Sequence, residues 1–322
     1  MHNDKEFQII INQALEKLSL DNQPDNLYAP IKYTIEIGGK RIRPILCLMA
    51  TELFEANYQE ALNAAIGIEI FHNFTLLHDD IMDKADMRRG KPSVHCQWNE
   101  NIALLSGDAM SVIAYKYIAE SKNLKGILNV FSDTALKICE GQQYDMDFEK
   151  TDNVSVEQYL KMIELKTAVL IAASLVIGAI TANASKEDQN NIYEFGINLG
   201  MAFQLQDDYL DTYGDIEKFG KPIGGDIVAN KKTFLLIKAL ELANDEMVNS
   251  IDFWLELKKF NKEEKISAIR NIYDNLAIAE ISKNLIKNYF LKAERALDSI
   301  NVLADRKNVL ENFYKSLRYR VF

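Results

Sequence analysis

The chain has 322 residues, of which 48% are hydrophobic and 26% are charged, and its formal net charge is −10. This composition is typical of a globular protein, either one large domain or two smaller ones. The acidic balance argues against a general nucleic-acid-binding surface, because such surfaces are basic. If the ligand is itself an anion, an acidic protein needs cations and a local basic cluster to hold it.

Helical periodicity dominates the chain, and alternating strand patterns are nearly absent. Apolar residues recur at three- and four-residue spacing over residues 7–19, 61–78, 103–119, 127–143, 156–180, 189–210, 233–243 and 263–298. Breaks are expected at residues 22–30, 88–93, 183–188 and 214–225, where glycine, proline and polar residues cluster. The sequence therefore predicts an all-α fold. One domain over residues 1–322 is the simplest organisation, and two domains are the alternative.

No targeting or metal-binding signal is visible outside the helical pattern. The first residues, MHNDKEFQIIINQALEKL, are charged and amphipathic, unlike a secretory signal. The longest apolar stretch, residues 168–180, is shorter than the about 20 apolar residues that cross a bilayer. The three cysteines are widely separated and indicate neither a zinc site nor a disulfide framework. We therefore expect a cytoplasmic protein without a membrane span.

Three aspartates lie close together in the segment LLHDDIMDKADMRRG, namely Asp79, Asp80 and Asp83. On a helix, their spacing places the carboxylates within an arc of roughly 100°. Such neighbours repel one another unless cations lie among them. Mg²⁺ suits this patch, because a few carboxylates together with water and phosphate oxygens satisfy its coordination.

The segment FQLQDDYLD repeats this spacing with Asp207, Asp208 and Asp211. A single copy could be a solvated helix end. Two copies that each follow an apolar stretch are harder to explain in that way, because water-facing helix surfaces rarely need apolar residues there. Neither copy has the alternating ligands and central glycine of an EF-hand loop. We therefore interpret the two motifs as opposite walls of one cleft that holds metal ions.

Basic side chains that could bind phosphate stand beside both motifs. Arg88 and Arg89 follow the first motif, and adjacent arginines can bind two different diphosphates through their forked guanidinium groups. The other candidates are Lys40, Arg41 and Arg43 in GGKRIRP, Lys166 in LKTAVLIAAS, and Lys221, Lys231 and Lys232 in FGKPIGGDIVANKKT, which also contains Asp226. Each of them alone could be an ordinary solvated charge. Together with the carboxylates and apolar helices, they predict a diphosphate head-group site above a hydrocarbon pocket.

These motifs together are specific enough to indicate a family. DDIMD followed by RRG, DDYLD preceded by FQ, GGKRIRP and the Lys166–Thr167 pair resemble the trans-isoprenyl diphosphate synthases of the polyprenyl synthetase family, over residues 35–233. The resemblance implies an isoprenoid-synthase-type helical bundle around a central active-site cavity, usually in a homodimer. It also implies condensation of isopentenyl diphosphate with an allylic diphosphate (dimethylallyl, geranyl or farnesyl), with release of diphosphate.

The resemblance also implies roles for individual residues. The two aspartate motifs would bind three Mg²⁺ that bridge the allylic diphosphate. Residues that match the allylic diphosphate site are Arg88, Lys166, Lys221 and Lys231, with Thr167 and Gln204 presenting oxygen dipoles to the allylic cation. Residues that match the isopentenyl diphosphate site are Lys40, Arg43, His72 and Arg89. His72 has an alternative interpretation as a core histidine with satisfied hydrogen bonds. No side-chain base is evident, and the released diphosphate is the expected proton acceptor.

Product length is expected to depend on the residues just before the first motif. Phe74 and Thr75 precede Asp79 by five and four positions, and Phe71 lies three further back. A bulky residue followed by a small one resembles enzymes that make C15 to C20 products, and geranylgeranyl diphosphate is preferred over farnesyl diphosphate. On an ideal helix, however, Phe74 lies about 140° from Asp79, whereas Thr75 lies about 40° away. Phe74 must then act from the flank of the helix, or the helix departs from ideal geometry.

Other functions share part of this pattern. A class I terpene cyclase also has an aspartate-rich motif, but it needs no isopentenyl site and usually lacks a second DDxxD. A non-catalytic subunit of a prenyl synthase complex would have lost the aspartates that this chain keeps. A longer-chain polyprenyl synthase and an inactive metal-binding protein are further alternatives. Lys40, Arg43 and Arg89 favour the synthase.

Overall fold

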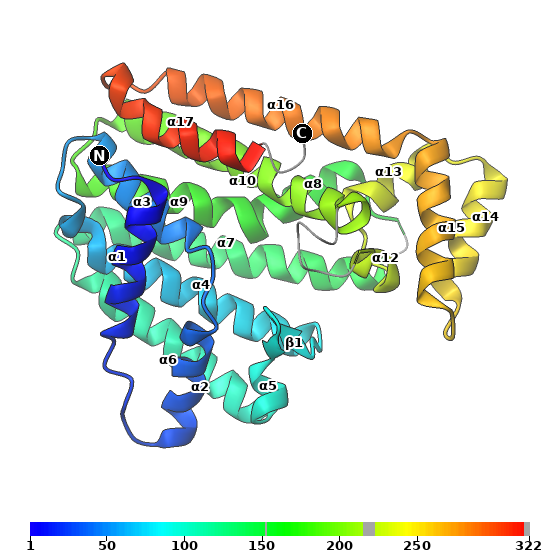
Figure 1. The fold of residues 1–322 in the computed structure, drawn as a ribbon, viewed down its shortest axis with the longest axis horizontal. Helices are drawn as coiled ribbons and strands as arrows, with labels where there is room; N and C mark the ends of the chain where they lie inside the picture. Colours follow the sequence, from blue (N-terminus) through cyan, green and yellow to red (C-terminus); the bar gives the residue numbers. More distant parts are fainter. Residues whose placement is uncertain (152, 215–222, 319–322) are drawn as a thin grey trace. The chain divides into compact units, whose positions relative to one another are not determined.

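The computed structural model describes residues 1–151, 153–214 and 223–318, and these residues are almost entirely helical (Figure 1). From the amino terminus the elements are α1 (Asp4–Glu16), α2 (Asp25–Glu36), α3 (Ile42–Leu53), η1 (Tyr58–Ala61), α4 (Leu62–Met82), β1 (Met87–Arg88), β2 (Lys91–Pro92), α5 (Val94–Gln97), α6 (Glu100–Ala119) and α7 (Leu124–Lys150). They continue with α8 (Val156–Ile163), η2 (Glu164–Ala168), α9 (Val169–Thr181), α10 (Lys186–Tyr213), α12 (Gly225–Val228), α13 (Phe234–Leu242), α14 (Asp245–Glu256), α15 (Lys262–Asn275), α16 (Ile278–Asp298) and α17 (Ala304–Arg318). The prediction of an all-α fold is confirmed.

The chain divides into two compact units, each built from separate segments. Unit 1 comprises Met1–Asp133, Ala173–Tyr193 and Ile300–Leu310, and unit 2 comprises Thr134–Ala172, Glu194–Ser299 and Glu311–Phe322. Several long helices contribute residues to both units. The prediction of a single domain over the whole chain stays a prediction.

Unit 1 is organised around α3 and α4. In α3 every residue from Pro44 to Thr51 is buried, and α4 is buried continuously from Ala64 to Phe71. A helix that is apolar on all sides belongs in a core, and α4 packs against α3 and α6. The helix starts are fixed by side chains, since Asn3 caps α1 in a capping box and Asn99 caps α6. The unit therefore holds the carboxyl end of α4, with its aspartates, on a rigid apolar support.

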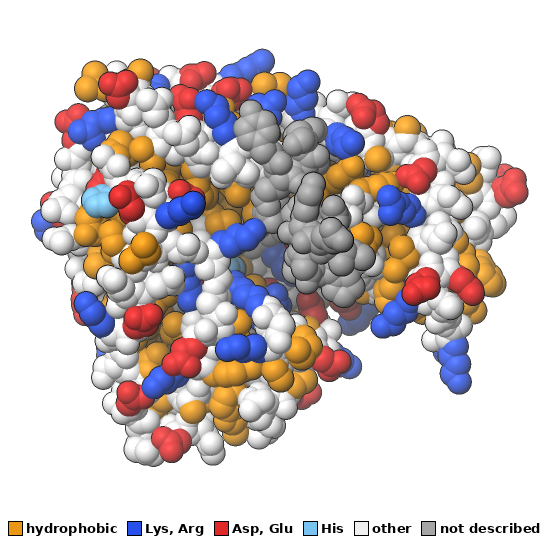
Figure 2. Space-filling view, in the orientation of Figure 1, with side chains coloured by type: hydrophobic (Ala, Val, Ile, Leu, Met, Phe, Trp, Pro, Cys, Tyr) orange, Lys and Arg blue, Asp and Glu red, His pale blue; other side chains and the backbone are white. Residues whose placement is uncertain are grey.

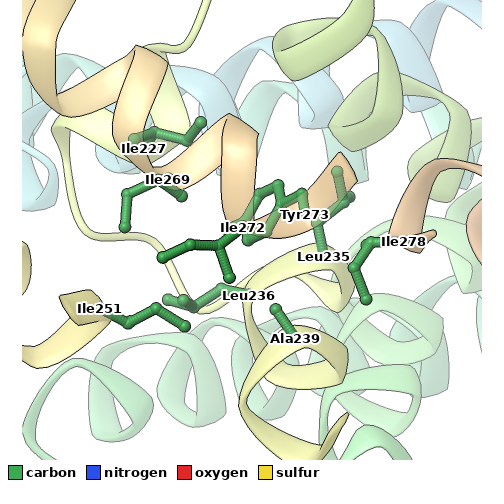
Figure 3. Packing of buried hydrophobic residues seen from close by; sticks show 9 residues of the cluster. All are labelled: Ile227, Leu235, Leu236, Ala239, Ile251, Ile269, Ile272, Tyr273 and Ile278. Atoms are coloured by element: carbon green, nitrogen blue, oxygen red, sulfur yellow. The ribbon is translucent and has the colours of Figure 1, made fainter. Parts of the chain in front are cut away.

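Unit 2 contains a compact apolar cluster between its later helices. Its members are Ile227 of α12, Leu235, Leu236 and Ala239 of α13, Ile251 of α14, Ile269, Ile272 and Tyr273 of α15, and Ile278 of α16 (Figure 3). The first of these, Ile227, lies in the short turn that follows the second aspartate motif. The sequence indicated no role for the helices after residue 262. They pack against Ile227, in the segment that carries Asp226 and Lys231.

Three sequence expectations about element boundaries need correction. Residues 263–298 form two helices, because Ala277 adopts a left-handed conformation (φ 54°) between α15 and α16, where no glycine or proline marks the break. The expected break over residues 22–30 ends early, since α2 begins at Asp25 and includes Pro30 in its second turn, where the missing N–H removes a single helical bond. The expected helix over residues 156–180 contains a π-helical turn, η2. Most of the expected break at residues 214–225 lies outside the described residues.

Two helices in the described part of the chain are long and apolar enough to cross a membrane by length and composition alone, namely α6 and the continuous helix Val156–Thr181. The expectation that the apolar stretch is too short is therefore wrong, because that stretch belongs to a helix of 26 residues. The apolar window of this long helix is 83% buried inside the protein, as in a core helix, whereas that of α6 is 33% buried. The predicted absence of a membrane span stays a prediction.

Candidate active site

The first aspartate motif lies at the carboxyl end of α4. Asp79 and Asp80 occupy its last turn, and Asp83 is the capping residue, whose backbone N–H donates to the carbonyl of Asp79 at 2.8 Å. Asp80 is 4% exposed, whereas Asp83 is exposed. The carboxyl end of a helix carries partial negative charge, so carboxylates at this position are unfavourable without compensating cations.

Arg88 of β1 supplies one such cation. Its Nε donates to Asp80 Oδ1 at 3.0 Å, and its Nη2 donates to the same oxygen. Burial acts to lower the pKa of Arg88, but the hydrogen bond and the charge of Asp80 outweigh burial, so the pKa is raised. The hairpin of β1 and β2 thus brings an arginine, expected to bind diphosphate, directly onto a metal-candidate carboxylate.

A second basic cluster in unit 1 contains the residues expected to bind isopentenyl diphosphate. Arg43 Nη1 lies 3.0 Å from His72 Nε2, and because arginine can only donate, His72 must accept through Nε2. Burial is the main reason why the pKa of Arg43 is lowered to about 10. Burial and the neighbouring arginines, Arg43 first among them, hold the pKa of His72 well below its usual value of 6.5. His72 thus lies beside Arg43 as a hydrogen-bond acceptor, and its role in the isopentenyl diphosphate site stays a prediction beside the alternative of a core histidine with satisfied hydrogen bonds.

Arg89 lies against the backbone of the GGKRIRP segment. Gly39 has φ +153°, a conformation that favours glycine, and a Cβ at this position would lie 2.6 Å from Arg89 Nη1, so the guanidinium lies directly against the glycine. Arg88 and Arg89 line one pocket of unit 1 together with Thr34, Ile37, Asn73, Leu76, Leu77, Asp80, Ser93 and Val94. Lys40 stands in the same turn as Gly39 and is exposed.

Arg41 has a different place from its basic neighbours. Its Nη1 donates to Glu69 Oε1 at 2.7 Å and its Nη2 donates to the carbonyl of Ile35 at 2.8 Å, with both Arg41 and Glu69 buried. Asn73 also donates to Glu69 Oε1, at 3.0 Å. Glu69 was not among the residues predicted for the site. The signal that could have found it is its position as an acidic residue within an otherwise apolar helix.

The second aspartate motif lies near the carboxyl end of α10 in unit 2. Asp207 is exposed, and Asp208 is buried and accepts hydrogen bonds from the Tyr159 hydroxyl and from Gln204 Nε2, the latter at 2.9 Å. Thr167 Oγ1 donates to Gln204 Oε1 at 3.1 Å. A continuous chain of hydrogen bonds therefore runs from Thr167 to Tyr159. Tyr159 was missed by the sequence analysis.

Asp211, the last aspartate of this motif, is tied to the next turn. Its carboxylate accepts from the backbone N–H of Asp226 at 2.9 Å, and its carbonyl accepts from the N–H of Gly224 at 2.6 Å. Gly224 has φ +82°, and an added Cβ would lie 2.7 Å from the Ile266 side chain, so the turn requires glycine. The turn brings Asp226 close to the second motif. Its place in a glycine-rich segment of the sequence did not predict this.

The carboxylates of unit 2 carry more negative charge than their surroundings compensate. Burial raises the pKa of Asp208 to about 6, against the lowering effect of its hydrogen bonds to Tyr159 and Gln204. Burial and the charges of Asp208 and Asp211 raise the pKa of Asp226 to about 8. A divalent cation would relieve this repulsion, and hard carboxylate oxygens are the ligands that Mg²⁺ prefers.

The donor set therefore fits Mg²⁺ in kind, although the side chains are paired with other groups as they stand. Among the residues that the structure describes, no three His, Cys, Asp or Glu side chains are arranged around one metal position. Asp80 is paired with Arg88 and Asp208 with Tyr159 and Gln204. These pairs would have to exchange partners to bind an ion.

The lysines expected near the allylic diphosphate differ in their surroundings. Lys166, in the π-helical turn, donates to Asp145 Oδ2 at 2.6 Å. The Lys231 side chain is 54% exposed, with Nζ 4.0 Å from Asp226 Oδ1. Lys232 donates to the carbonyls of Phe148 and Thr151 at the end of α7. Lys221 lies outside the described residues.

The three residues expected to set product length lie on one regular helix. Phe71 packs against Phe74 and against Phe131 of α7, with ring centroids 5.3 and 5.1 Å apart. Phe74 also contacts His78, at 4.7 Å between centroids, and Thr75 Oγ1 donates to the His72 carbonyl. Since α4 is an uninterrupted α-helix, Phe74 lies on its flank, as one of the two sequence-based alternatives required.

In the face drawn in Figure 2, acidic and basic side chains are interspersed. The basic clusters of the candidate site are therefore local features that the net charge of −10 does not predict.

Comparison with known proteins decides the family. Residues 24–273 match the family model described as polyprenyl synthetase. The chain belongs to the polyprenyl synthetase family. It is 35% identical over 310 residues to the geranylgeranyl diphosphate synthase of Methanosarcina mazei, covering 94% of this chain and 92% of that one. It is 37% identical over 256 residues to the geranylfarnesyl diphosphate synthase of Natronomonas pharaonis, covering 73% and 75%.

The fold agrees with this assignment. A crystal structure of a geranylgeranyl pyrophosphate synthase superposes with a TM-score of 0.94 at 42% sequence identity, and the match covers 99% of each chain. The family is one of prenyltransferases, which are generally metal-dependent.

The neutral state of His72 makes stability depend on pH. The unfolded chain takes up a proton at this residue near pH 6.5, while the folded chain does not, so the free energy of unfolding falls as pH decreases below that value. We expect His72→Gln to reduce this loss by up to about 1.4 kcal/mol per pH unit. Urea denaturation between pH 7 and 5 measures it, with His2→Gln as the control for losing a histidine elsewhere. An unchanged pH dependence in His72→Gln would contradict the prediction.

Proposed function

We propose that this chain is a Mg²⁺-dependent prenyltransferase that adds isopentenyl diphosphate to dimethylallyl, geranyl and farnesyl diphosphates. Its product would be a short-chain (E)-prenyl diphosphate, with geranylgeranyl diphosphate favoured. The observation that carries the proposal is that each unit holds one DDxxD motif near a cation expected to bind diphosphate. In unit 1, Arg88 is bonded to Asp80. In unit 2, Lys231 Nζ lies 4.0 Å from Asp226 Oδ1, and the backbone N–H of Asp226 donates to Asp211. That the two motifs line one cavity stays a prediction.

The residues divide between metal, leaving group and acceptor. Both DDxxD motifs would hold Mg²⁺, three ions by resemblance, which when bound neutralise the charge that develops on the departing diphosphate. Arg88, Lys166, Lys221 and Lys231 would bind that diphosphate, and Lys166 would exchange Asp145 for a phosphate oxygen. As the C1–O bond of the allylic substrate breaks, the oxygens of Thr167 and Gln204 would face the allylic cation.

The basic cluster of unit 1 would hold the second substrate. Arg43 and His72 are already joined, and Arg89 is placed beside them by Gly39, so the cluster is preorganised for a diphosphate. Lys40 would complete the site. The double bond of isopentenyl diphosphate forms the new C–C bond, and the proton lost from its C2 would go to the released diphosphate, since no side-chain base is evident.

The other candidate functions explain less. A terpene cyclase would have no use for the Arg43–His72–Arg89 cluster, and a non-catalytic subunit would have no use for two complete aspartate motifs. The relatives are named for C20 and C25 products, which supports a short chain and does not favour the C15 alternative.

A homodimer is part of the proposal, and one helix of unit 1 supports it. Leu104, Leu105 and Val112 of α6 are 51%, 60% and 63% exposed, which is unusual for three large apolar residues on one helix. A second copy of the chain could cover them. A cytoplasmic location remains a prediction from the sequence.

The reaction itself is tested with the purified protein, Mg²⁺, labelled isopentenyl diphosphate and each allylic primer. We expect incorporation of label, abolished by a chelator. Asp208→Asn should lower kcat by about a hundredfold or more, because it removes charge that the transition state requires. Asp252→Asn, an exposed acid on α14, is the control and should leave kcat unchanged. Failure of the wild-type protein to incorporate isopentenyl diphosphate with any primer would contradict the proposal.

Product length is tested at Phe74. Replacing the ring with a methyl group opens space beside Phe71, so Phe74→Ala should lengthen the main product by one or more isoprene units. Phe74→Tyr keeps the ring and should leave the product profile unchanged. Chromatography of the dephosphorylated products measures both. An identical profile for Phe74→Ala would exclude this residue as the floor of the pocket.

The dimer is tested by sedimentation velocity. Leu105→Glu places a charge on the exposed face of α6 and should convert the dimer to a monomer. Leu303→Glu, at a residue that is 70% exposed elsewhere in unit 1, is the matched control and should remain dimeric. A monomeric wild-type protein would contradict the proposed assembly.

A further inference from the structure

Lys265 is a fully buried lysine in the first turns of α15, with an exposed fraction of 0%. Burial of an ammonium group is unfavourable unless polar partners compensate. Its Nζ donates to Asn230 Oδ1 and lies 4.3 Å from the centroid of the Phe260 ring. Burial also lowers the pKa of Lys265. A methionine would fill the same space without the cost of desolvating an ammonium group. Packing alone therefore does not explain why a lysine stands at position 265.

Asn230, the partner of Lys265, stands at a point where the backbone changes direction. It has φ +56°, a left-handed conformation that asparagine tolerates better than most residues. Its Nδ2 donates to the carbonyl of Leu255 at 2.9 Å, so both ends of its amide are held. The next residue in the chain is Lys231, and the conformation of Asn230 sets the direction in which Lys231 leaves the turn.

The other side of the turn is held by Lys232. Its Nζ donates to the carbonyl of Phe148 at 2.7 Å and also to that of Thr151, which are end carbonyls of α7. A cation is favourable at this end of a helix. Lys232 therefore binds backbone carbonyls, although its position in the sequence beside Lys231 suggested that both lysines bind the diphosphate.

These anchors enclose a short segment that carries two candidate residues. Within it, the Lys231 N–H donates to the Asp226 carbonyl at 2.9 Å, and the Asp226 N–H donates to Asp211 at 2.9 Å. Ile227, which belongs to the same segment, packs in the apolar cluster of unit 2 (Figure 3). The position of Lys231 relative to the second aspartate motif thus depends on Asn230, on its partner Lys265, and on Lys232.

We propose that Lys265, acting through Asn230, and Lys232, acting through the end of α7, are positioning residues that fix the segment 226–233 and so hold Lys231 and Asp226 at the second aspartate motif. This inference rests on the proposed function for the role of Lys231. It assigns to α15 an indirect part in binding the allylic diphosphate. A purely structural role for Lys265 would lower stability without distinguishing the two substrates.

The test compares Lys265→Met with Ile251→Ala, which weakens the apolar cluster in which Ile227 packs but removes no polar anchor of the turn. We expect Lys265→Met to raise KM for the allylic diphosphate about tenfold, equivalent to about 1.4 kcal/mol, with KM for isopentenyl diphosphate changed less than about twofold. Ile251→Ala should lower the melting temperature at least as much and leave the ratio of the two KM values unchanged. Equal rises in both KM values in Lys265→Met, or the same ratio in both variants, would overturn the proposal.

A double-mutant cycle identifies the path of the effect. Asn230→Gly keeps the left-handed conformation and removes the amide, so Lys265→Met should have little further effect in its presence. Full additivity of the two changes would show that Lys265 does not act through Asn230.

Amide hydrogen exchange gives a readout that does not depend on activity. Exchange at residues 226–233 should be about tenfold faster in Lys265→Met than in the wild-type protein, and faster than in Ile251→Ala at matched stability. Unchanged exchange would overturn the anchoring role even if the chain is an active synthase. Faster exchange in Lys265→Met, combined with a wild-type protein that incorporates no isopentenyl diphosphate, would support the anchor and reject the proposed function.

Discussion

Repulsion among clustered carboxylates is the constraint to which both units respond. At the end of α4, three aspartates add to the partial negative charge of the helix end, and Arg88 is bound to the most buried of them. Near the end of α10, Asp208 is held by Tyr159 and Gln204. There burial and the charges of Asp208 and Asp211 raise the pKa of Asp226 to about 8. In unit 1 a cation thus offsets the negative charge of the buried aspartate, and in unit 2 hydroxyl and amide donors stabilise it.

The basic cluster of unit 1 shows the opposite problem. Arg41, Arg43 and Arg89 lie close enough to repel one another, and Glu69 is the carboxylate that offsets them. Because Arg41 is already paired with Glu69, the charge that remains for a ligand comes from the other two arginines. A buried pair of this kind adds little net stability. Its effect is to fix the backbone of the GGKRIRP turn, where Arg41 itself has φ 52°.

The helices and the charged motifs could be predicted from the sequence, because both depend on local spacing. The 3.6-residue periodicity located most of the long helices, although not α2, α3, α14 or α17, and the repeated DDxxD spacing located both acidic motifs. Tyr159 and Glu69 could not be found in this way, since their partners lie 49 and 28 residues away in the chain. The break at Ala277 was hidden for a different reason. The apolar pattern continues through it, and the left-handed residue is an alanine where glycine would have been the expected signal.

The π-helical turn between α8 and α9 determines which side chains share a direction. Tyr159 and Thr167 are eight residues apart, and on a regular α-helix they would differ by about 80° in orientation. The π-helical turn η2 accommodates one additional residue, which reduces the total rotation between the two side chains by about 100°. The two side chains are therefore almost aligned. Both then reach α10 at Asp208 and Gln204, which lie one turn apart. Without this single-residue shift in helical register, Tyr159 and Thr167 would point in different directions and could not join one hydrogen-bonded network, while the helix itself would remain intact.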